Sequence, residues 1–145
     1  SNVIAIDFSE EALAVAEKNA KCIGVKNIDF VKSDFLKQSI DFRADLLVSN
    51  PPYVPKKDIS TLMTDVKKYE PSEALTDNLD GLEFYRVFSK KFDTIIKRDG
   101  ALIVEVGRDE HPLEVKKILE QSGHENIEMI NDYNGDTRVL KVMKC

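Results

Sequence analysis

Short apolar runs alternate along this chain with segments whose apolar residues recur every three or four positions. Such alternation is typical of the α/β class, in which a mostly parallel sheet is flanked by helices. Asn134 and Gly135 predict a tight turn between the last two runs, so the chain should close with an antiparallel hairpin. The runs that predict strands are Val3 to Ile6, Ile28 to Val31, Asp45 to Ser49, Ala101 to Val106, Asn126 to Ile130 and Arg138 to Met143.

Three segments have the spacing of an amphipathic helix. The first begins after the capping residue Ser9 and ends at Gly24. The second runs from Leu82 to Ile96 and the third from about Pro112 to Gly123, while Pro55 to about Asp80 is polar and predicts a loop. In the first helix the apolar residues that recur at intervals of three and four are Leu13, Ala16, Ala20 and Ile23, and in the second those on one side are Phe84, Val87, Phe88, Phe92 and Ile95.

Three of the predicted strands end at polar residues, Asp7, Asp34 and Asn50. In open α/β sheets the ligand binds beyond the carboxyl ends of the strands, so we expect these three side chains to converge on one site. An acidic residue in the position of Asp7 can accept hydrogen bonds from both hydroxyls of a ribose. The alternative is an aspartate that only interacts with the dipole of the helix beginning at Ser9.

The most specific chemistry lies at Asn50-Pro51-Pro52-Tyr53, directly after the strand that ends at Ser49. Two successive prolines remove two backbone donors, so the carbonyl and amide oxygens face no competing N–H group. Such acceptors suit a planar NH2 group, and Tyr53 offers an aromatic face for an amide or a nucleobase. Hydrogen bonds from both N–H groups would help this poor nucleophile attack a methyl donor. A proline-rich turn that merely ends a strand is the alternative, but residue identity, order and position favour function.

This tetrapeptide resembles the signature of class I S-adenosyl-L-methionine-dependent methyltransferases that modify amino nitrogens of adenine, cytosine or glutamine. Further stretches are similar to the HemK-type peptide chain release factor glutamine N5-methyltransferases, which extends the resemblance over essentially the whole chain. These stretches are Tyr69 to Leu75, Asp80 to Tyr85, Val104 to Gly107, Asp132 with Tyr133, and Arg138 with Val139. The resemblance implies a Rossmann-like sheet, S-adenosyl-L-methionine as methyl donor and a release factor as protein partner.

The resemblance also implies roles for the residues of the signature. Asn50 and the carbonyl group of Pro51 would hold the amide nitrogen of the substrate. Pro52 would shape the turn, and Tyr53 would pack on the plane of the amide. All four residues are therefore predicted to be catalytic and to bind substrate.

Cofactor binding is assigned in the same way. Asp7 would bind the ribose, Asp34 would accept a hydrogen bond from the adenine amino group, and Phe35 would stack on the adenine ring. This arrangement would leave the sulfonium methyl group aimed at Asn50. Ordinary turn chemistry at Asp34 and a core position for Phe35 are the alternatives.

Charged residues of the predicted polar loop also have two interpretations. By the resemblance, Glu70 with Pro71 would order the substrate side of the pocket, whereas a plain loop acid at Glu70 would pair with Arg86 or Lys68. Four lysines would form either a local basic patch or, as we favour, a solvated face: Lys56, Lys57, Lys67 and Lys68.

The family places a first strand and a glycine-rich loop before the strand that ends in the ribose acid, and none of the six glycines here forms a Gly-x-Gly loop. It also has an amino-terminal helical substrate domain. We expect residues 1–145 to be a partial methyltransferase catalytic domain without these parts, binding cofactor weakly and weak or inactive as an enzyme. The first strand would lie beside both Val3 to Ile6 and Leu46 to Val48, so its loss would expose two edges, which a homodimer could pair.

Composition changes this picture little. A length of 145 residues with 42% hydrophobic residues fits one domain with a sizeable core. The formal charge of −5 argues against unspecific nucleic-acid binding, and no apolar stretch is long enough to span a bilayer. Cys22 and Cys145 make no disulfide framework and have no metal-ligand spacing with His111 or His124, so we expect no metal site and a cytoplasmic location.

Two other functions remain open. An adenine N6-methyltransferase acting on RNA or DNA would carry the same tetrapeptide, although the acidic charge and the stretch from Glu70 to Leu82 count against it. A non-catalytic remnant or interaction module would keep the fold without the cofactor loop, and the intact tetrapeptide counts against that reading.

Overall fold

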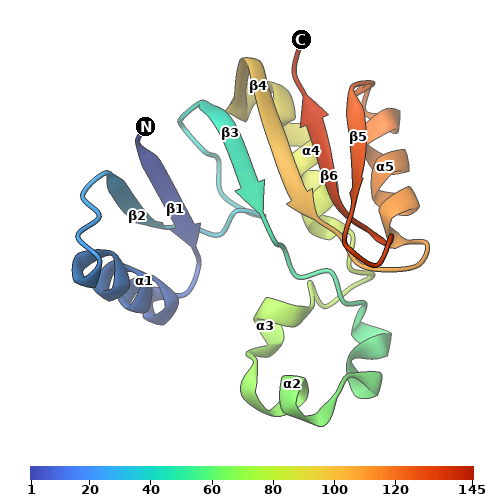
Figure 1. The fold of residues 1–145 in the computed structure, drawn as a ribbon, viewed down its shortest axis with the longest axis horizontal. Coiled ribbons are helices and arrows are strands. Elements are labelled where there is room, and N and C mark those ends of the chain that lie inside the picture. Colours follow the sequence, from blue (N-terminus) through green and yellow to red (C-terminus); the bar gives the residue numbers. More distant parts are fainter. The chain divides into compact units, whose positions relative to one another are not determined.

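A computed structural model describes all residues from 1 to 145, which form two compact units, residues 1–41 and residues 42–145. Both units have α/β structure, as the alternating pattern predicts (Figure 1). In the first unit β1 (Val3–Asp7) and β2 (Ile28–Lys32) pair in parallel, with Val3 opposite Ile28 and Asp7 opposite Lys32. The helix α1 (Glu10–Cys22) connects the two strands.

The ends of α1 follow from two residues. The Ser9 hydroxyl oxygen accepts a hydrogen bond from the backbone N–H of Ala12 at 3.2 Å, which satisfies one of the free donors at the helix start. Gly24 adopts a φ of 75°, a left-handed conformation that ends helices and favours glycine. Both boundaries agree with the predicted ones.

The second unit contains a four-stranded sheet in the order β3-β4-β6-β5. The strands β3 (Ala44–Ser49) and β4 (Ile96–Glu105) are parallel, whereas β6 (Thr137–Met143) runs antiparallel to both β4 and β5 (Ile127–Asn131). The parallel β3–β4 pair and the closing β5–β6 hairpin confirm the predicted fold class.

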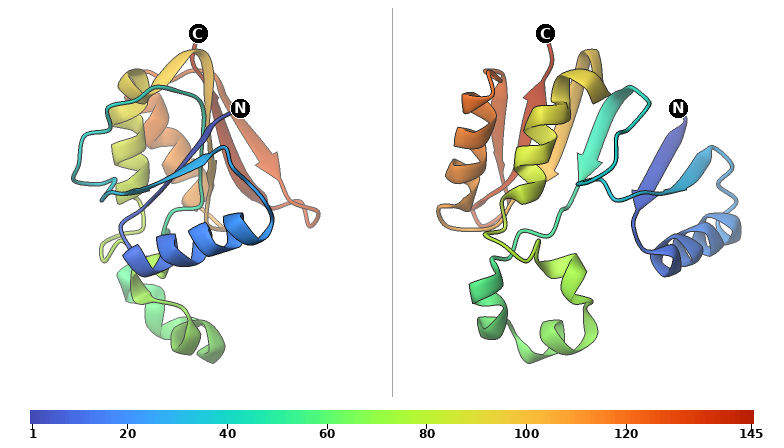
Figure 2. Two further views of the ribbon diagram at one scale, coloured as in Figure 1. Left: turned by 90° about the vertical axis from the view of Figure 1, so that its left-hand side faces the viewer. Right: turned by 180° about the vertical axis from the view of Figure 1, so that it is seen from behind.

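Two helices cover one face of this sheet (Figures 1 and 2). They are α4 (Glu83–Ile95), which packs against β4, and α5 (His111–Gln121), which packs against β6. The sheet side chains that they cover include Leu102, Val104, Leu140 and Val142, all 0 to 1% exposed. On α4 the predicted apolar side is buried except for the half-buried Phe84, and it also includes Tyr85.

The predicted loop between Pro55 and Asp80 is wrong in detail, because it contains three short helical segments. These are the 3-10 helix η1 (Lys56–Thr61) and the helices α2 (Thr64–Tyr69) and α3 (Ser72–Leu75), which lie beyond the carboxyl ends of β3 and β4 (Figure 1). None of the three contains a buried residue, so no apolar periodicity marks them in the sequence.

Both end strands of each sheet have a free edge, β1 and β2 in the first unit and β3 and β5 in the second. On β3 the apolar side chains of Leu46 and Val48 are 52% and 64% exposed, although Ala101, which lies opposite Leu46 on β4, is buried. A free apolar strand edge is prone to pair with another strand. None of the helices combines the length and the apolar character that a membrane crossing requires.

Candidate active site

Asn50 follows the last residue of β3, at the carboxyl end of the parallel pair β3–β4. Its side chain is exposed and its amide makes no hydrogen bond in the structure, so both polar atoms are available to a ligand. Pro51 is buried directly behind it, while Pro52 and Tyr53 are half-buried. The loop thus presents one polar side chain outward on a backbone that packing holds in place.

Backbone hydrogen bonds hold the chain after Tyr53. The Val54 N–H donates to the Leu75 carbonyl at 2.9 Å, and the Lys56 N–H donates to the Leu79 carbonyl at 3.0 Å. The residues after α3 therefore run alongside the loop that follows β3. Two segments far apart in sequence share one hydrogen-bonded unit at the end of the sheet.

Gly81 makes the closest approach to this loop. A Cβ atom at Gly81 would lie 2.3 Å from the backbone oxygen of Tyr53, and the φ of Gly81 is 82°. Real Cβ atoms do not approach so closely, and left-handed φ values disfavour other residues. Glycine is required at this position for two independent reasons.

The phenol of Tyr53 is held by residues from two other strands. Its hydroxyl group donates to Glu105 Oε1 at 3.1 Å and accepts from an Arg138 guanidinium nitrogen at 3.2 Å. The same nitrogen of Arg138 donates to Glu105 Oε1 at 2.9 Å, which closes a triangle. The Arg138 guanidinium carbon also lies 5.8 Å from the centre of the Tyr53 ring.

His111 also lies near Tyr53, with its ring centre 5.9 Å from that of Tyr53 and 5.3 Å from that of Tyr85. His111 Nδ1 accepts from the Gly107 N–H at 3.1 Å, so the proton of the neutral ring resides on Nε2, 3.3 Å from the Gly81 carbonyl. Burial lowers the pKa of His111, which favours this neutral form.

Tyr85 supports the same cluster from α4. Its hydroxyl group donates to the backbone oxygen of Glu105 at 2.7 Å, and its side chain is almost fully buried. Burial, with the neighbouring Tyr53 and Glu105, raises the pKa of Tyr85 far above its ordinary value, so the phenol stays a donor at all physiological pH values.

Acidic side chains fix the turn that carries Gly81. Asp77 Oδ1 accepts from the N–H groups of Leu79 and Gly81 at 2.8 and 3.0 Å, and Asp77 Oδ2 accepts from the Glu83 N–H at 3.0 Å. Asp80 pairs with Arg86, whose guanidinium holds the pKa of that carboxyl at about 2.

The suggested pairing of Glu70 with Arg86 is wrong, because Arg86 forms its ion pairs with Asp80 and Glu83. Lys68 lies over the ring of Tyr69, 5.0 Å from its centre, and forms no ion pair with Glu70. Glu70 itself is exposed at the end of α2. Its substrate role stays a prediction.

The predicted cofactor residues lie in the first unit. Asp7 ends β1; its Oδ1 accepts from the Ser9 N–H at 2.8 Å, and its other carboxylate oxygen makes no hydrogen bond, which leaves an acceptor for a ribose hydroxyl. Asp34 Oδ1 accepts from the Leu36 N–H at 3.1 Å, and Oδ2 pairs with Lys37 at 2.8 Å. Lys37 lowers the pKa of Asp34, and Phe35 beside it is half-buried. These residues fit the predicted group chemically, and their convergence with Asn50 stays a prediction.

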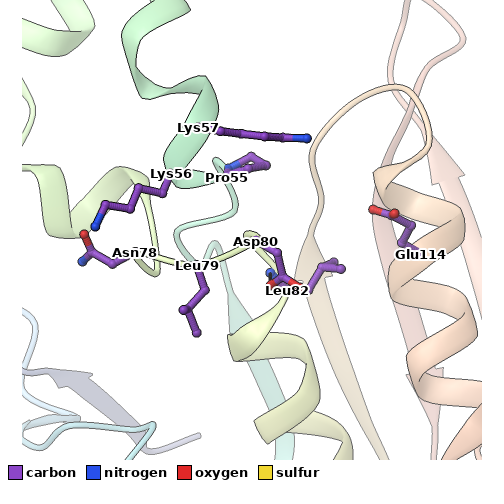
Figure 3. A pocket seen from close by; sticks show the side chains of 8 residues that line it. All are labelled: Pro55, Lys56, Lys57, Asn78, Leu79, Asp80, Leu82 and Glu114. Atoms are coloured by element: carbon purple, nitrogen blue, oxygen red, sulfur yellow. Dashed lines mark hydrogen bonds between the residues drawn. The ribbon is translucent and has the colours of Figure 1, made fainter.

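A hollow of about 620 Å³ lies next to the loop, on the side of α5. It contains side chains of both charge signs, with Lys56 and Lys57 on one side and Asp80 and Glu114 on the other (Figure 3). None of Asn50 to Tyr53 lines it, so it adjoins the candidate site rather than forming it. Its mixed charge agrees with a solvated face rather than a basic patch. The complete lining is Pro55, Lys56, Lys57, Asn78, Leu79, Asp80, Leu82 and Glu114.

Comparison with known proteins shows the family of the chain. Residues 1–139 match the family described as "Methyltransferase domain". The chain belongs to this methyltransferase family. Two relatives named "Release factor glutamine methyltransferase" come from Fusobacterium nucleatum, at 40% identity over 100% of this chain and 41% of the relative, and Clostridium botulinum, at 42% over 79% of this chain and 41% of the relative. The resemblance found in the sequence is confirmed.

The chain spans about half the length, or less, of the curated relatives it matches. Solved structures show the same fold: a methyltransferase from Pyrococcus furiosus has a TM-score of 0.69 at 16% identity, covering 99% of this chain and 62% of that one. The N-methyltransferase NodS from Bradyrhizobium japonicum, solved with S-adenosyl-L-homocysteine, has a TM-score of 0.57 at 14% identity, covering 99% of this chain and 66% of that one. The methyltransferase fold is one that S-adenosyl-L-methionine-dependent enzymes use.

Sequence reasoning missed the residues that surround Tyr53. Glu105, Arg138 and Gly107 stood only within resembling stretches, and His111 was considered only as a metal ligand. Glu105 lies one residue before the end of the predicted strand Ala101 to Val106 and is the last residue of β4, so a polar residue near a strand end is the signal that could have singled it out. The contact of His111 with Gly107 is local, only four residues away, whereas its contact with the Gly81 carbonyl joins segments 30 residues apart, which no local pattern marks.

Proposed function

We propose that this methyltransferase domain transfers a methyl group from S-adenosyl-L-methionine to the side-chain amide nitrogen of a glutamine in a peptide chain release factor. The observation that carries the proposal is an exposed Asn50 with an unpaired amide at the carboxyl end of β3, in a chain up to 42% identical to release factor glutamine methyltransferases. We infer the substrate from the name of the relatives and the chemistry from the residues of the loop after β3.

The chain's own residues bind and orient the nitrogen. The Asn50 side-chain oxygen and the Pro51 carbonyl each accept a hydrogen bond from one N–H of the glutamine amide. Because both acceptors lie in the amide plane, they strengthen as positive charge develops on the nitrogen, so they stabilise the transition state more than the ground state. No strong base is needed before attack: the nitrogen–carbon bond would form as the sulfonium sulfur–carbon bond breaks, and the methylated nitrogen would then lose one proton to solvent at this exposed position.

Pro52 and Tyr53 set the direction of approach. Pro52 fixes the backbone dihedral angle of the turn, and the Tyr53 ring restricts the amide to one plane. The cofactor, when bound, supplies an electrophilic methyl group on a sulfonium centre. Asp7 would hold its ribose, Asp34 its adenine amino group and Phe35 the face of its ring.

We further propose that the 145-residue chain alone binds this cofactor weakly. None of its six glycines forms a Gly-x-Gly loop, so several backbone contacts to the methionine part of the cofactor have no donor here. At about 0.5 to 1.5 kcal/mol each, their loss totals roughly 3 to 5 kcal/mol, or about a hundred- to several-thousand-fold in affinity. Calorimetric titration of the chain measures this directly, and a micromolar dissociation constant would contradict it.

The substrate is tested with the complete encoded protein that contains these residues. It is incubated with tritiated S-adenosyl-L-methionine and, in separate reactions, a purified release factor and bulk tRNA. We expect label in the release factor, removed when its accepting glutamine is replaced by alanine. Label in tRNA alone would overturn the glutamine assignment, and label in neither would favour a non-catalytic role.

A further inference from the structure

The Tyr53–Glu105–Arg138 triangle brings together three parts of the chain that are distant in sequence. Tyr53 belongs to the loop after β3, Glu105 is the last residue of β4, and Arg138 is the second residue of β6. The strand register places Glu105 opposite Val139, next to Arg138, and the Val106 N–H donates to the Arg138 carbonyl at 3.0 Å. The pairing of β4 with β6 therefore holds Glu105 beside Arg138 independently of Tyr53.

The Glu105–Arg138 pair is also the more sheltered of the two ion pairs of β6. Its side chains are 33% and 22% exposed, whereas the Glu128–Lys141 pair on the neighbouring strands has exposed fractions of 61% and 34%. Partial burial reduces screening, and a guanidinium holds its geometry better than an ammonium. The pair is rigid enough to hold a third group.

The Tyr53 hydroxyl fits that third position with both of its hydrogen-bonding functions in use. It donates to Glu105 and accepts from Arg138, so its direction is set by two bonds of different polarity. The centre of the His111 ring lies 5.9 Å from that of Tyr53, and this ring connects the Gly107 N–H to the Gly81 carbonyl. Two hydrogen bonds hold the Tyr53 hydroxyl group and the His111 ring lies near the Tyr53 ring, while Asn50 at the other end of the tetrapeptide stays exposed.

We infer that Glu105 and Arg138 are positioning residues for methyl transfer, which act by holding the Tyr53 phenol and through it the plane in which the substrate amide lies. This inference rests on the proposed function. Neither residue touches the substrate. A tyrosine released from the triangle can rotate about its side-chain bonds, and the amide that packs on it then loses its alignment with the methyl donor.

The expected kinetic consequence is specific. Misplacement of a reacting group by about an ångström lowers turnover by roughly a hundredfold. We expect Glu105→Gln and Arg138→Met to lower kcat by about ten- to a hundredfold, with KM for the cofactor changed less than threefold. Arg138→Lys keeps the positive charge but not the guanidinium that donates to both Tyr53 and Glu105, so its kcat should lie between those of the parent protein and Arg138→Met.

A double-mutant cycle separates positioning from a general effect on folding. If Glu105 acts through the phenol, Glu105→Gln should lower kcat tenfold or more in the parent protein but less than twofold in a Tyr53→Phe background. Lys141→Met is the matched control, because it breaks the other ion pair of β6 without touching Tyr53, and its kcat should be unchanged. The experiment uses the complete encoded protein with release factor and tritiated cofactor.

A second measurement is independent of activity. In protein labelled with carbon-13 at the tyrosine ζ position, the Tyr53 signal is assigned by its loss in Tyr53→Phe and should shift in Glu105→Gln and Arg138→Met but not in Lys141→Met. A moved signal with no methylation by the parent protein would count against the proposed function and leave the contact standing. Additive losses of kcat in the cycle, or an unmoved Tyr53 signal, would overturn the positioning role.

Discussion

Asn50 differs from its neighbours because its side-chain amide is exposed and makes no hydrogen bond, whereas Pro51 beside it is buried. Replacing a polar side chain that makes no hydrogen bond in the fold costs little stability. A loss of activity in such a variant therefore reports a functional role. The backbone that carries it is fixed by the buried proline and by two backbone hydrogen bonds at Val54 and Lys56. Its functional weight can therefore be measured separately from the fold.

The first prediction concerns Asn50→Ala in the complete encoded protein. Removing one acceptor that strengthens in the transition state should lower kcat by about a hundredfold or more. The melting temperature should stay within about 2 °C, since the side chain makes no hydrogen bond. Asn19→Ala, at an exposed position of α1, is the control and should keep full turnover. Unchanged turnover in Asn50→Ala would refute the proposed chemistry.

His111 carries a pH dependence that follows from its hydrogen bonds. Burial lowers its pKa below the ordinary 6.5, opposed by the Gly81 carbonyl and Glu114; Arg138 lowers it further and Asp80 raises it. Protonation would place a hydrogen on Nδ1, where the Gly107 N–H already donates. The unfolded chain binds the proton more readily, so the folded state loses stability as the pH falls below about 6.5.

The second prediction therefore concerns how steeply the free energy of unfolding changes with pH. The free energy of unfolding should decrease between about pH 6.5 and 5 more steeply in the parent protein than in His111→Gln, because glutamine cannot titrate. Carboxylates titrate equally in both proteins, so the comparison isolates His111. Urea unfolding at a series of pH values measures it, and equal slopes would show that His111 is not held neutral.

At the scale of elements, the turn between α3 and α4 holds the loop after β3 against the sheet. Asp77 accepts three backbone N–H groups in this turn, and Gly81 then passes Tyr53 closely enough to exclude any side chain. The helix α4 begins directly after this turn, and its Tyr85 donates a hydrogen bond to the backbone oxygen of Glu105.

The third prediction compares two glycines with nearly the same backbone conformation. Gly81 has a φ of 82° and a blocked Cβ position, whereas Gly123 has a φ of 88° and nothing within 4 Å of its Cβ position. Gly123→Ala should cost about 1 to 2 kcal/mol from the left-handed conformation alone. Gly81→Ala should cost about 2 to 5 kcal/mol, because overpacking adds to it. Urea unfolding provides both values, and equal costs would contradict the close approach.

At the scale of the whole molecule, each of the two units has an unpaired strand edge. In the second unit β3 and β5 each have such an edge, and on β3 the side chains of Leu46 and Val48 are exposed on the same face. Such an edge offers free backbone groups and apolar side chains to a further strand. The 145-residue chain by itself is therefore expected to associate in solution through its edges.

The fourth prediction tests this association by light scattering over a range of concentrations. The 145-residue chain should form dimers or larger species, and Val48→Lys should shift it toward the monomer, because a lysine on an edge strand opposes pairing. Val15→Lys is the matched control, since Val15 is 60% exposed on α1 against 64% for Val48, and it should leave association unchanged. A monomer at every concentration would exclude edge pairing.

The order of strands and helices could be predicted from the sequence, because apolar periodicity reports which faces are buried. The capping residue Ser9, the terminating Gly24 and the turn at Asn134-Gly135 marked their boundaries in the same local way. The short helices between Pro55 and Asp80 could not be predicted in this way, because they bury no residue and so have no apolar periodicity in the sequence.

The chemistry proposed for the tetrapeptide Asn50 to Tyr53 likewise follows from residues adjacent in sequence, since two prolines and a strand end act locally. What holds Tyr53 was decided only by tertiary structure. Glu105, Arg138 and His111 lie 52, 85 and 58 positions away, and only the pairing of β4 with β6 and the packing of α5 bring them to it. Hydrogen bonds between distant residues depend on the register of the sheet, which no local pattern contains.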